Sequence, residues 1–430
     1  MSKSVLATPL TLPCGAVLPN RLGKGAMTEG LADPHNRATD RHVTLYKRWA
    51  AGGTGMLLTG NVQIDRRYLE RPGNVAIDGS NGGLKALEAY AAAGTSNNNH
   101  LWMQISHAGR QTPKAVTSEP VGPSAVPLNM PGGLFGEPRA LSVEEIEVLI
   151  DRFANACLTA KQTGFTGAQI HAAHGYLLSE FLSPIANKRD DQYGGSLENR
   201  ARFLLSVLRK ARAAVGPDFP ISVKLNSSDF QQGGYTHEEC LQVVEWLGQE
   251  GVDLLEISGG NYEQPSMMGS DGAMEPIYDS HVTERTKARE AYFLNYAKSI
   301  KQVSTIPVMV TGGFRSRAAM EDAIRDGDAD LVGIARPLCI MPDLSNKLLA
   351  GQIDMAPAYE QTLRLGPGIL GPQSNIALIK ALNFGGVQAW FCEQIFRMAD
   401  GLDPDPKMGV FRAFLRYQRG EGAAAKALVY

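Results

Sequence analysis

Residues 306–337, "IPVMVTGGFRSRAAMEDAIRDGDADLVGIARP", decide the fold class. The stretch opens on a short apolar run that ends in two glycines and closes on a second apolar run. Between the two runs, Ala319, Ala323 and Ile324 recur at the spacing of an amphipathic helix. A strand, a helix and a second strand within about 30 residues form the unit from which parallel α/β sheets are built.

The same alternation of apolar runs and helix-period segments continues along the chain. Eight short runs have the composition of strands buried on both faces, and they lie at 22–27, 55–61, 101–107, 167–173, 221–226, 253–260, 306–313 and 329–337. Among the helical segments between them, the clearest begins at Ser142, because Glu145 three residues later predicts a capping box. Eight strands mostly followed by helices favour a (β/α)8 TIM barrel of the α/β class. A doubly wound sheet is the rival, but "GKGAMTEG" lacks the G-x-G-x-x-G spacing expected after its first strand.

Several segments exceed a minimal barrel. The Pro- and Gly-rich loop 112–140 follows the third run and the loop 264–290 follows the sixth, so both are expected to overhang the barrel mouth. We expect residues 1–350 to form the barrel with an N-terminal cap, and residues 351–430 to form a helical extension packed on it. Three aromatic residues of the extension leave open whether it packs on the barrel or on a second subunit of a homo-oligomer: Trp390, Phe391 and Phe396.

Composition excludes several classes of protein. Hydrophobic residues make up 43% and charged residues 20% of the chain, an ordinary balance for a globular protein. The net charge of −2 gives no electrostatic reason to expect a nucleic acid or an anionic membrane as partner. Because we find neither a secretory signal nor an apolar run of about 18 residues, we expect a soluble, cytoplasmic protein. The five cysteines stand alone in sequence, which argues against disulfides and against C-x-x-C metal or iron–sulfur sites.

Polar and flexible residues fall where the seventh and eighth runs end. In a barrel of this type the active site lies at the carboxyl ends of the strands. The seventh run ends at Gly312 and Gly313, whose amides no side chain would obstruct, and the eighth ends at Ala335 and Arg336. Together they predict a binding site for a terminal phosphate. The alternative is that the two glycines only make a tight turn.

Three polar residues predict a flavin ring beside that phosphate. Lys224 lies within the fifth run, and a lysine inside a barrel needs a negative partner, either an anionic reduced flavin or Glu256. Gln104 lies within the third run and can both donate and accept, which suits the pyrimidine edge of a flavin. Thr28, at the end of the first run, can donate its hydroxyl to the same ring.

The segment "HAAHGY", residues 171–176, follows the fourth run and carries two histidines and a tyrosine. It suggests a metal site, a hydride-transfer site, or a strand end whose polar groups only satisfy the backbone. The metal interpretation is the weaker one, because no Asp, Glu or Cys stands nearby in the motif as a third ligand.

The longer stretch "HAAHGYLLSEFLSPIANKRDDQYGGSLENRARF" (171–203) resembles the signature of the Old Yellow Enzyme family of FMN-dependent oxidoreductases. The motifs "LPNRL", "AMT", "QISHAGR", "VGPS", "SVKLNSSDF", "LEISGG", "TGGF" and "GIARPL" follow in family order and extend the likeness over residues 8–345. The likeness is to the branch with H-x-x-H-G-Y.

This resemblance implies non-covalent FMN at the barrel mouth, with NADH or NADPH as electron donor and a small electrophilic molecule as substrate. The residues that match the family's cofactor site are Ala26, Met27 and Thr28 along the flavin, Gly60 against the ring, Gln104 and Lys224 at the pyrimidine side, and Gly312, Gly313, Ala335 and Arg336 at the phosphate. His171 and His174 are expected to hydrogen-bond the substrate's carbonyl or nitro oxygen, and Tyr176 to donate the proton.

Three functions follow as hypotheses. The first is an NAD(P)H-dependent ene-reductase that reduces the C=C bond of α,β-unsaturated carbonyl compounds. The second keeps the flavin in an oxidative N-demethylase or an NADH oxidase. The third is a flavin-free lyase or aldolase with Lys224 as activated lysine.

Two departures from the family's pattern affect the site. Many relatives have a cysteine where this chain has Thr28, so tuning of the flavin by a thiol is not expected. Some relatives have a tyrosine in the place of Gly30 that contacts substrate. The substrate pocket is therefore expected to be roomier, or to be filled from elsewhere.

Overall fold

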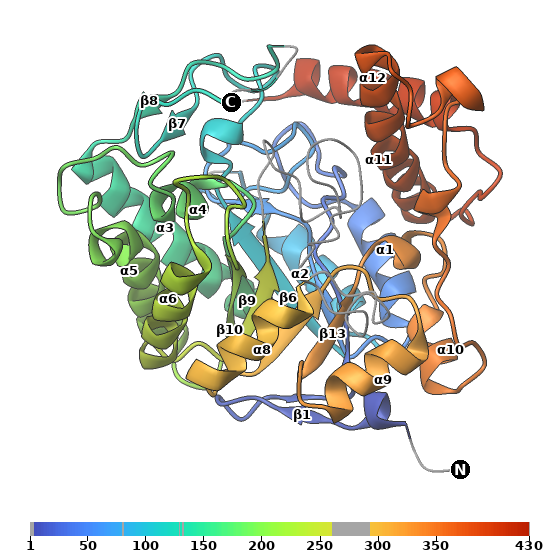
Figure 1. Ribbon diagram of the computed structural model, residues 1–430, viewed down its shortest axis with the longest axis horizontal. Helices are drawn as coiled ribbons and strands as arrows, with labels where there is room; N and C mark the ends of the chain where they lie inside the picture. The colour runs from blue at the N-terminus through green and yellow to red at the C-terminus, as the bar shows by residue number, and fades with distance from the viewer. Residues whose placement is uncertain (1–3, 80, 129, 131–132, 260–292, 430) are drawn as a thin grey trace.

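A computed structural model describes residues 4–79, 81–128, 130, 133–259 and 293–429. Its centre is a closed barrel of eight parallel strands (Figure 1): β3 (Leu22–Lys24), β4 (Met56–Leu58), β6 (His100–Ser106), β9 (Gly167–Ala172), β10 (Ile221–Asn226), β11 (Leu254–Ser258), β12 (Val308–Thr311) and β13 (Leu331–Ile334). Each strand pairs with the next in this order, and β13 pairs with β3 to close the ring. Seven of the eight runs predicted from sequence contain one of these strands, and the third overlaps β6, which begins one residue before it, so the predicted barrel is confirmed.

Helices lie between the strands and surround the barrel (Figure 1): α1 (Asp40–Ala50), α2 (Leu84–Gly94), α3 (Val143–Gln162), α4 (Leu177–Leu182), α5 (Leu197–Val215), α6 (His237–Gln249), α8 (Leu294–Val303), α9 (Arg317–Arg325) and α10 (Leu344–Leu349). Helix α3 shows why they begin where they do. The Ser142 hydroxyl accepts the Glu145 N–H at 3.2 Å, and the Glu145 carboxylate accepts the Ser142 N–H at 2.8 Å. The predicted capping box is therefore confirmed.

A hairpin closes the amino-terminal end of the barrel. Strands β1 (Leu10–Thr11) and β2 (Val17–Leu18) pair antiparallel. Their leucines share one apolar cluster with residues of the barrel strands: Leu10, Leu12, Leu18, Met56, Leu58, Trp102, Leu254, Met309 and Leu331. The expected N-terminal cap thus seals one end of the barrel, and a ligand must enter at the other.

The chain after α10 adds two long helices, α11 (Ala377–Ala399) and α12 (Val410–Ala427). Helix α11 packs on α1, and the fully buried Trp390 donates its indole N–H to the Met408 carbonyl at 2.8 Å. Helix α12 runs across the top of Figure 1, and Leu428 beyond it packs against Leu69, Ala76 and Val116 of the mouth loops. Trp390 and Leu428 therefore pack within the chain itself.

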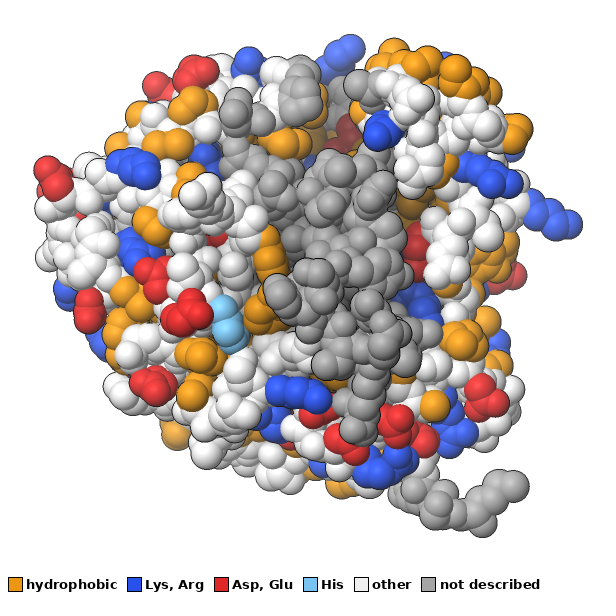
Figure 2. All heavy atoms as spheres, in the orientation of Figure 1, with side chains coloured by type: hydrophobic (Ala, Val, Ile, Leu, Met, Phe, Trp, Pro, Cys, Tyr) orange, Lys and Arg blue, Asp and Glu red, His pale blue; other side chains and the backbone are white. Residues whose placement is uncertain are grey.

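Part of the C-terminal extension also carries exposed apolar side chains. Hydrophobic atoms gather at the upper right of Figure 2, the side on which α11 and α12 lie in Figure 1. The exposed apolar side chains of the extension include Ile369, Leu378, Phe411 and Leu415. Oligomeric state and location in the cell stay predictions. None of the described helices is long and apolar enough to cross a membrane.

The two predicted mouth loops differ in how much of them is described. Loop 112–140 contains the short parallel pair β7 (Val121–Gly122) and β8 (Arg139–Ala140), and its residues 129, 131 and 132 lie outside the described part. Loop 264–290 lies wholly outside the described residues. A further short strand, β5 (Val62–Gln63), pairs with β6 at the mouth.

Candidate functional site

Residues predicted for the phosphate converge on one cavity at the carboxyl ends of the strands. It has a volume of about 190 Å³, and seven predicted site residues line it: Ala26, His174, Lys224, Gly312, Gly313, Ala335 and Arg336. Gly312 and Gly313 have φ angles of +128° and +82°, which side-chain-bearing residues rarely adopt. Their backbone amides and the Arg336 guanidinium form a cradle suited to an anion.

Sequence reasoning missed a second arginine in the wall of this cavity. Arg315 follows the two glycines, lines the cavity and forms an ion pair with Glu360. Glu360 belongs to the segment between α10 and α11, so the C-terminal extension contacts the phosphate loop directly. Position alone could have suggested Arg315, but its carboxylate partner is 45 residues away in sequence.

His171 is held as a neutral donor. It is 2% exposed, and its Nδ1 accepts the Ala173 N–H at 3.2 Å. Since one ring nitrogen of a neutral imidazole accepts and the other donates, Nε2 carries the proton. Burial, and then the charge of Lys224, lower the pKa of His171 well below its ordinary value.

His174 sits in a constrained backbone conformation beside it. Its φ angle is +63°, and its N–H donates to the Asn226 Oδ1 at 3.1 Å. Its Nε2 lies 2.6 Å from the Ser258 hydroxyl. Burial, the charge of Lys224 and then that of His171 lower its pKa well below the ordinary value. Left-handed non-glycine residues of this kind concentrate at functional sites.

Tyr176 completes the trio. Its ring centroid lies 4.8 Å from that of His171 at an interplanar angle of 86°, and the two histidine rings are 5.1 Å apart. The Asn61 amide donates to the Tyr176 hydroxyl oxygen at 3.4 Å. The structure therefore brings the three predicted catalytic residues together. It adds Asn61, which stands at the end of the second predicted run.

Lys224 forms an ion pair with Glu256, the alternative partner that the sequence suggested. Its Nζ lies 3.0 Å from the Glu256 Oε1, and Glu256 is fully buried. Lys224 also lines the cavity, so the ion pair does not remove it from the site. Gln104 donates its amide to the Gln169 Oε1 at 2.7 Å inside the barrel.

The loop after β3 forms the opposite wall of the mouth. Gly60 approaches it so closely that a Cβ there would lie 2.2 Å from the Glu29 Oε2 and 2.6 Å from the Met27 carbonyl oxygen. The Gly60 N–H donates to the Glu29 Oε1 at 2.8 Å. Thr28 hydrogen-bonds the carboxyl of the half-buried Glu70. Sequence reasoning missed Glu29, although a carboxylate directly after the "AMT" motif was a usable signal.

The space beside Gly30 is filled from elsewhere, one of the two outcomes expected. A Cβ on Gly30 would lie 2.5 Å from the Arg71 Cζ. Arg71 is 5% exposed, forms an ion pair with Glu421 of α12 and lies 5.0 Å from the centre of the Tyr417 ring. The C-terminal extension thus fixes a side chain at the mouth.

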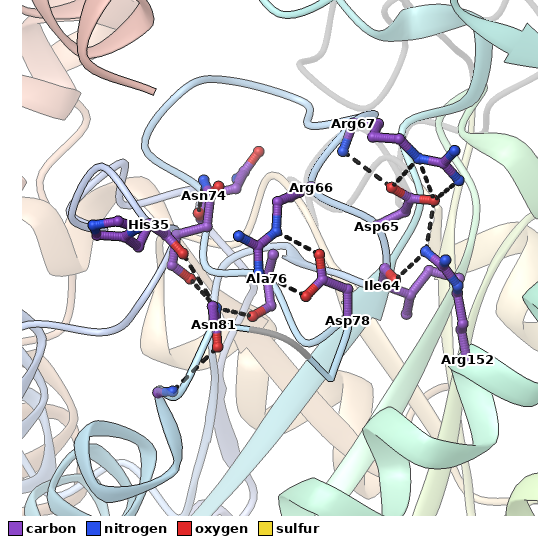
Figure 3. Close-up of polar contacts among 12 residues, drawn as sticks. His35, Ile64, Asp65, Arg66, Arg67, Asn74, Ala76, Asp78, Asn81 and Arg152 are labelled. Carbon is purple, nitrogen blue, oxygen red and sulfur yellow. Dashed lines mark hydrogen bonds and ion pairs between the residues drawn. The ribbon is translucent and has the colours of Figure 1, made fainter. Parts of the chain in front are cut away.

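The loop that carries Arg71 is braced by ion pairs (Figure 3). Arg66 binds Asp78 through two hydrogen bonds of 2.6 and 2.8 Å, and Asp65 accepts from Arg152 of α3 at 2.6 Å. The Arg66–Asp78 pair is bidentate and partly buried, and a pair of this kind holds a loop in one conformation. The residues of the mouth that pack on this loop are therefore held in place.

Comparison with known proteins gives a family. The model of the NADH:flavin oxidoreductase / NADH oxidase family matches residues 6–354. An NADH-dependent flavin oxidoreductase, iliE, of Neonectria sp. is 39% identical over 78% of this chain, which spans 45% of that relative. The iliE protein of Hypocrea jecorina is 36% identical over 81% of this chain and 90% of its own length.

Solved structures agree on the fold. A 2-naphthoyl-CoA reductase in complex with 2-naphthoyl-CoA has a TM-score of 0.73 and 27% identity over 82% of this chain and 53% of its own. A homologue of old yellow enzyme from Zymomonas mobilis has a TM-score of 0.68 and 24% identity over 84% of this chain and 97% of its own.

FMN is the cofactor of this family, and the residues present fit it. The glycine cradle with Arg336 suits its phosphate. Among the described residues, no donor reaches the Gln104 Oε1, which leaves an acceptor for the ring's imide N–H. From its sequence and from this site, the chain belongs to the NADH:flavin oxidoreductase / NADH oxidase family.

Proposed function

We propose that this NADH:flavin oxidoreductase reduces the C=C bond of α,β-unsaturated carbonyl compounds and related electrophiles. The observation that carries the proposal is the packing of Tyr176 on His171, with ring centroids 4.8 Å apart. It places a neutral imidazole donor and a phenol beside one another at the barrel mouth. One of the solved relatives is named for 2-naphthoyl-CoA, a conjugated thioester, which supports this substrate class.

His171 would bind and polarise the substrate's carbonyl oxygen. FMN, when bound, supplies the hydride that adds to the β-carbon of the alkene. Negative charge then grows on the carbonyl oxygen, where the Nε2–H of His171 is the donor that Ala173 leaves available. One such donor contributes about 3–4 kcal/mol of transition-state stabilisation. His174, whose ring centroid lies 5.1 Å from that of His171, would supply the second contact to the carbonyl oxygen.

Tyr176 would then deliver a proton to the α-carbon. The hydride and this proton together saturate the double bond, so the reaction balances with one NADH or NADPH oxidised per alkene. Asn61 donates to the phenol oxygen, so the phenol's own hydrogen points away from the Asn61 amide.

The cofactor would be held by the residues predicted from sequence. The phosphate would bind Gly312, Gly313, Ala335 and Arg336, the pyrimidine edge Gln104 and Lys224, and the remaining ring edge Ala26, Met27, Thr28 and Gly60. Their positions in or directly after the carboxyl-terminal halves of six barrel strands support these roles.

The test separates the two half-reactions. Holoenzyme is reduced with NADH without oxygen and then mixed with a panel of enones, and flavin re-oxidation is followed by absorbance. Tyr176→Phe and His171→Ala are expected to slow re-oxidation by the enone at least 100-fold, while reduction by NADH continues. Tyr193→Phe, which alters a tyrosine bound to Glu147 on α3, is the matched control and keeps both rates. Full enone turnover in both site variants would refute the assigned roles.

A second candidate on the same flavin is an NADH oxidase that passes electrons to oxygen. A relative from Thermoanaerobacter brockii, 35% identical over 78% of this chain and 49% of its own length, carries that name. Oxygen consumption by the NADH-reduced holoenzyme, compared with enone turnover under the same conditions, separates the two. Reduction of the flavin by N-methyl amines in place of NADH would instead favour the demethylase. The family assignment favours all of these flavin reactions over the flavin-free lyase or aldolase.

A further inference from the structure

Four polar side chains form one chain of contacts inside the barrel, below the mouth. Gln104 on β6 pairs in register with Gln169 on β9, and Lys224 on β10 pairs in register with Glu256 on β11. Gln104 donates to Gln169 at 2.7 Å, and Gln169 donates to the Glu256 Oε2 at 2.9 Å. Glu256 and Gln169 are fully buried. Sequence reasoning proposed Glu256 only as a partner of Lys224 and assigned no role to Gln169.

The carboxylate fixes the direction of this chain. An ionised carboxylate only accepts hydrogen bonds, so the Gln169 amide must turn its NH₂ group to Glu256. Its Oε1 then faces Gln104 and can accept only from the NH₂ group of that residue. As a result the Gln104 Oε1 is the end left without a donor among the described residues. One buried charge thereby orients two amides in succession.

The same carboxylate offsets the charge of Lys224. The Glu256 Oε1 lies 3.0 Å from the Lys224 Nζ outside hydrogen-bond geometry, so the contact is an ion pair. In the barrel interior a unit charge acts strongly on its neighbours, because little water is present to screen it. Lys224 also lines the cofactor cavity, so Glu256 controls how much positive charge the cavity presents.

We propose that Glu256 is a positioning residue for FMN: through Gln169 it turns the Gln104 carbonyl toward the flavin's imide N–H, and through Lys224 it sets the flavin's reduction potential. The inference rests on FMN as cofactor and does not depend on the proposed alkene substrate.

Glu256→Gln reverses the chain. The ammonium of Lys224 attracts the new carbonyl oxygen, so the new NH₂ group turns to Gln169. Gln169 must then accept from it and donate to Gln104, which turns its NH₂ group toward the flavin's own N–H donor. Two facing donors replace one hydrogen bond, so FMN is expected to bind about tenfold more weakly. The dissociation constant is measured from the fluorescence of FMN released on dilution of the holoenzyme.

The reduction potential of the bound FMN provides a second measurement. Loosened packing alone would not shift it in the expected direction. With Glu256→Gln, Lys224 loses its compensating charge and favours negative charge on the reduced cofactor, so the two-electron potential rises. A potentiometric titration of the holoenzyme measures it. Gln169→Glu alone adds a carboxylate to the same layer and is expected to lower the potential. It also provides the second variant if Glu256→Gln folds poorly.

The double variant Glu256→Gln with Gln169→Glu decides the matter. The carboxylate introduced on β9 would accept from Gln104 and from the new amide on β11, so the original direction and the total charge both return. The affinity for FMN is expected to return to within about twofold of the wild-type value. The reduction potential is expected to return to near the wild-type value. Glu393→Gln, which changes a buried carboxylate of α11 paired with Arg416, is the matched control and leaves both quantities unchanged. Wild-type affinity and potential in Glu256→Gln, or no recovery in the double variant, would overturn the inference.

Discussion

The Asn61 amide donates a hydrogen bond to the Tyr176 hydroxyl oxygen across 3.4 Å, and both side chains are buried. Asn61 follows β4, and Tyr176 stands at the start of α4. The amide occupies a lone pair of the phenol and directs the phenol's own hydrogen elsewhere. This relationship gives the proposed proton donor its orientation.

Asn61→Asp should therefore impair proton donation and leave hydride uptake intact. The new carboxylate accepts the phenol's hydrogen and keeps it from the substrate. We expect re-oxidation of the reduced holoenzyme by an enone to slow about tenfold, and reduction by NADH to keep its rate. Stopped-flow absorbance measures both. Asn98→Asp makes the same exchange at an exposed position and serves as control. An equal loss in both half-reactions would indicate damage to the flavin site instead.

The barrel was predictable because its strands are short apolar runs buried on both faces. Such a run can be recognised in the sequence without knowing which strand it pairs with. The glycines at 312 and 313 were predictable for a related reason. Their position at a strand end and their lack of a side chain already imply a ligand cradle. Family likeness then assigned His171, His174 and Tyr176, and the structure places their rings together.

The supports of the site were not predictable, because each depends on a partner far away in sequence. Arg71 and Glu421 are 350 residues apart, and no local pattern marks either of them. Gln169 and Glu256 are 87 residues apart and meet only because β9 and β11, the strands on either side of β10, bring them into one layer. Sequence periodicity identifies elements, whereas these contacts arise from how the elements pack.

Arg336→Gln tests the phosphate cradle. The guanidinium is the charged member of the cradle, and a charge-assisted bond to phosphate contributes about 1.5–3 kcal/mol. FMN binding is expected to weaken at least tenfold, measured by fluorescence of released FMN. Arg325→Gln removes an exposed arginine of the neighbouring α9 and should leave the affinity unchanged. Equal affinity in the two variants would place the phosphate elsewhere.

The burial of His42 predicts that the folded protein loses stability in acid. Burial lowers the pKa of this histidine from 6.5 to about 4. Between these two values the unfolded chain binds a proton that the folded chain does not, so stability falls as the pH falls. Its contribution to the slope is about 1.4 kcal/mol per pH unit. Urea denaturation at several pH values between 6.5 and 4.5 measures this slope.

His42→Gln should remove that contribution and keep the start of α1. The His42 Nδ1 accepts the Thr39 N–H at 3.1 Å, and a glutamine at this position can accept it as well. We expect the pH slope of the unfolding free energy to become shallower by one proton. His35→Gln alters an exposed histidine and should keep the wild-type slope. A slope that is the same in all three proteins would mean that His42 titrates normally.

Glu421→Ala should show that α12 holds the mouth in place. The change leaves the buried side chain of Arg71 without its carboxylate partner, at a cost of about 3 kcal/mol in the free energy of unfolding. Because Arg71 fills the space beside Gly30, protease cleavage within residues 64–79 should also become faster. Asp400→Ala removes the exposed partner of Arg41 and should cost less than about 1 kcal/mol. Urea denaturation and limited proteolysis measure these effects, and equal costs in the two variants would exclude an anchoring role for Glu421.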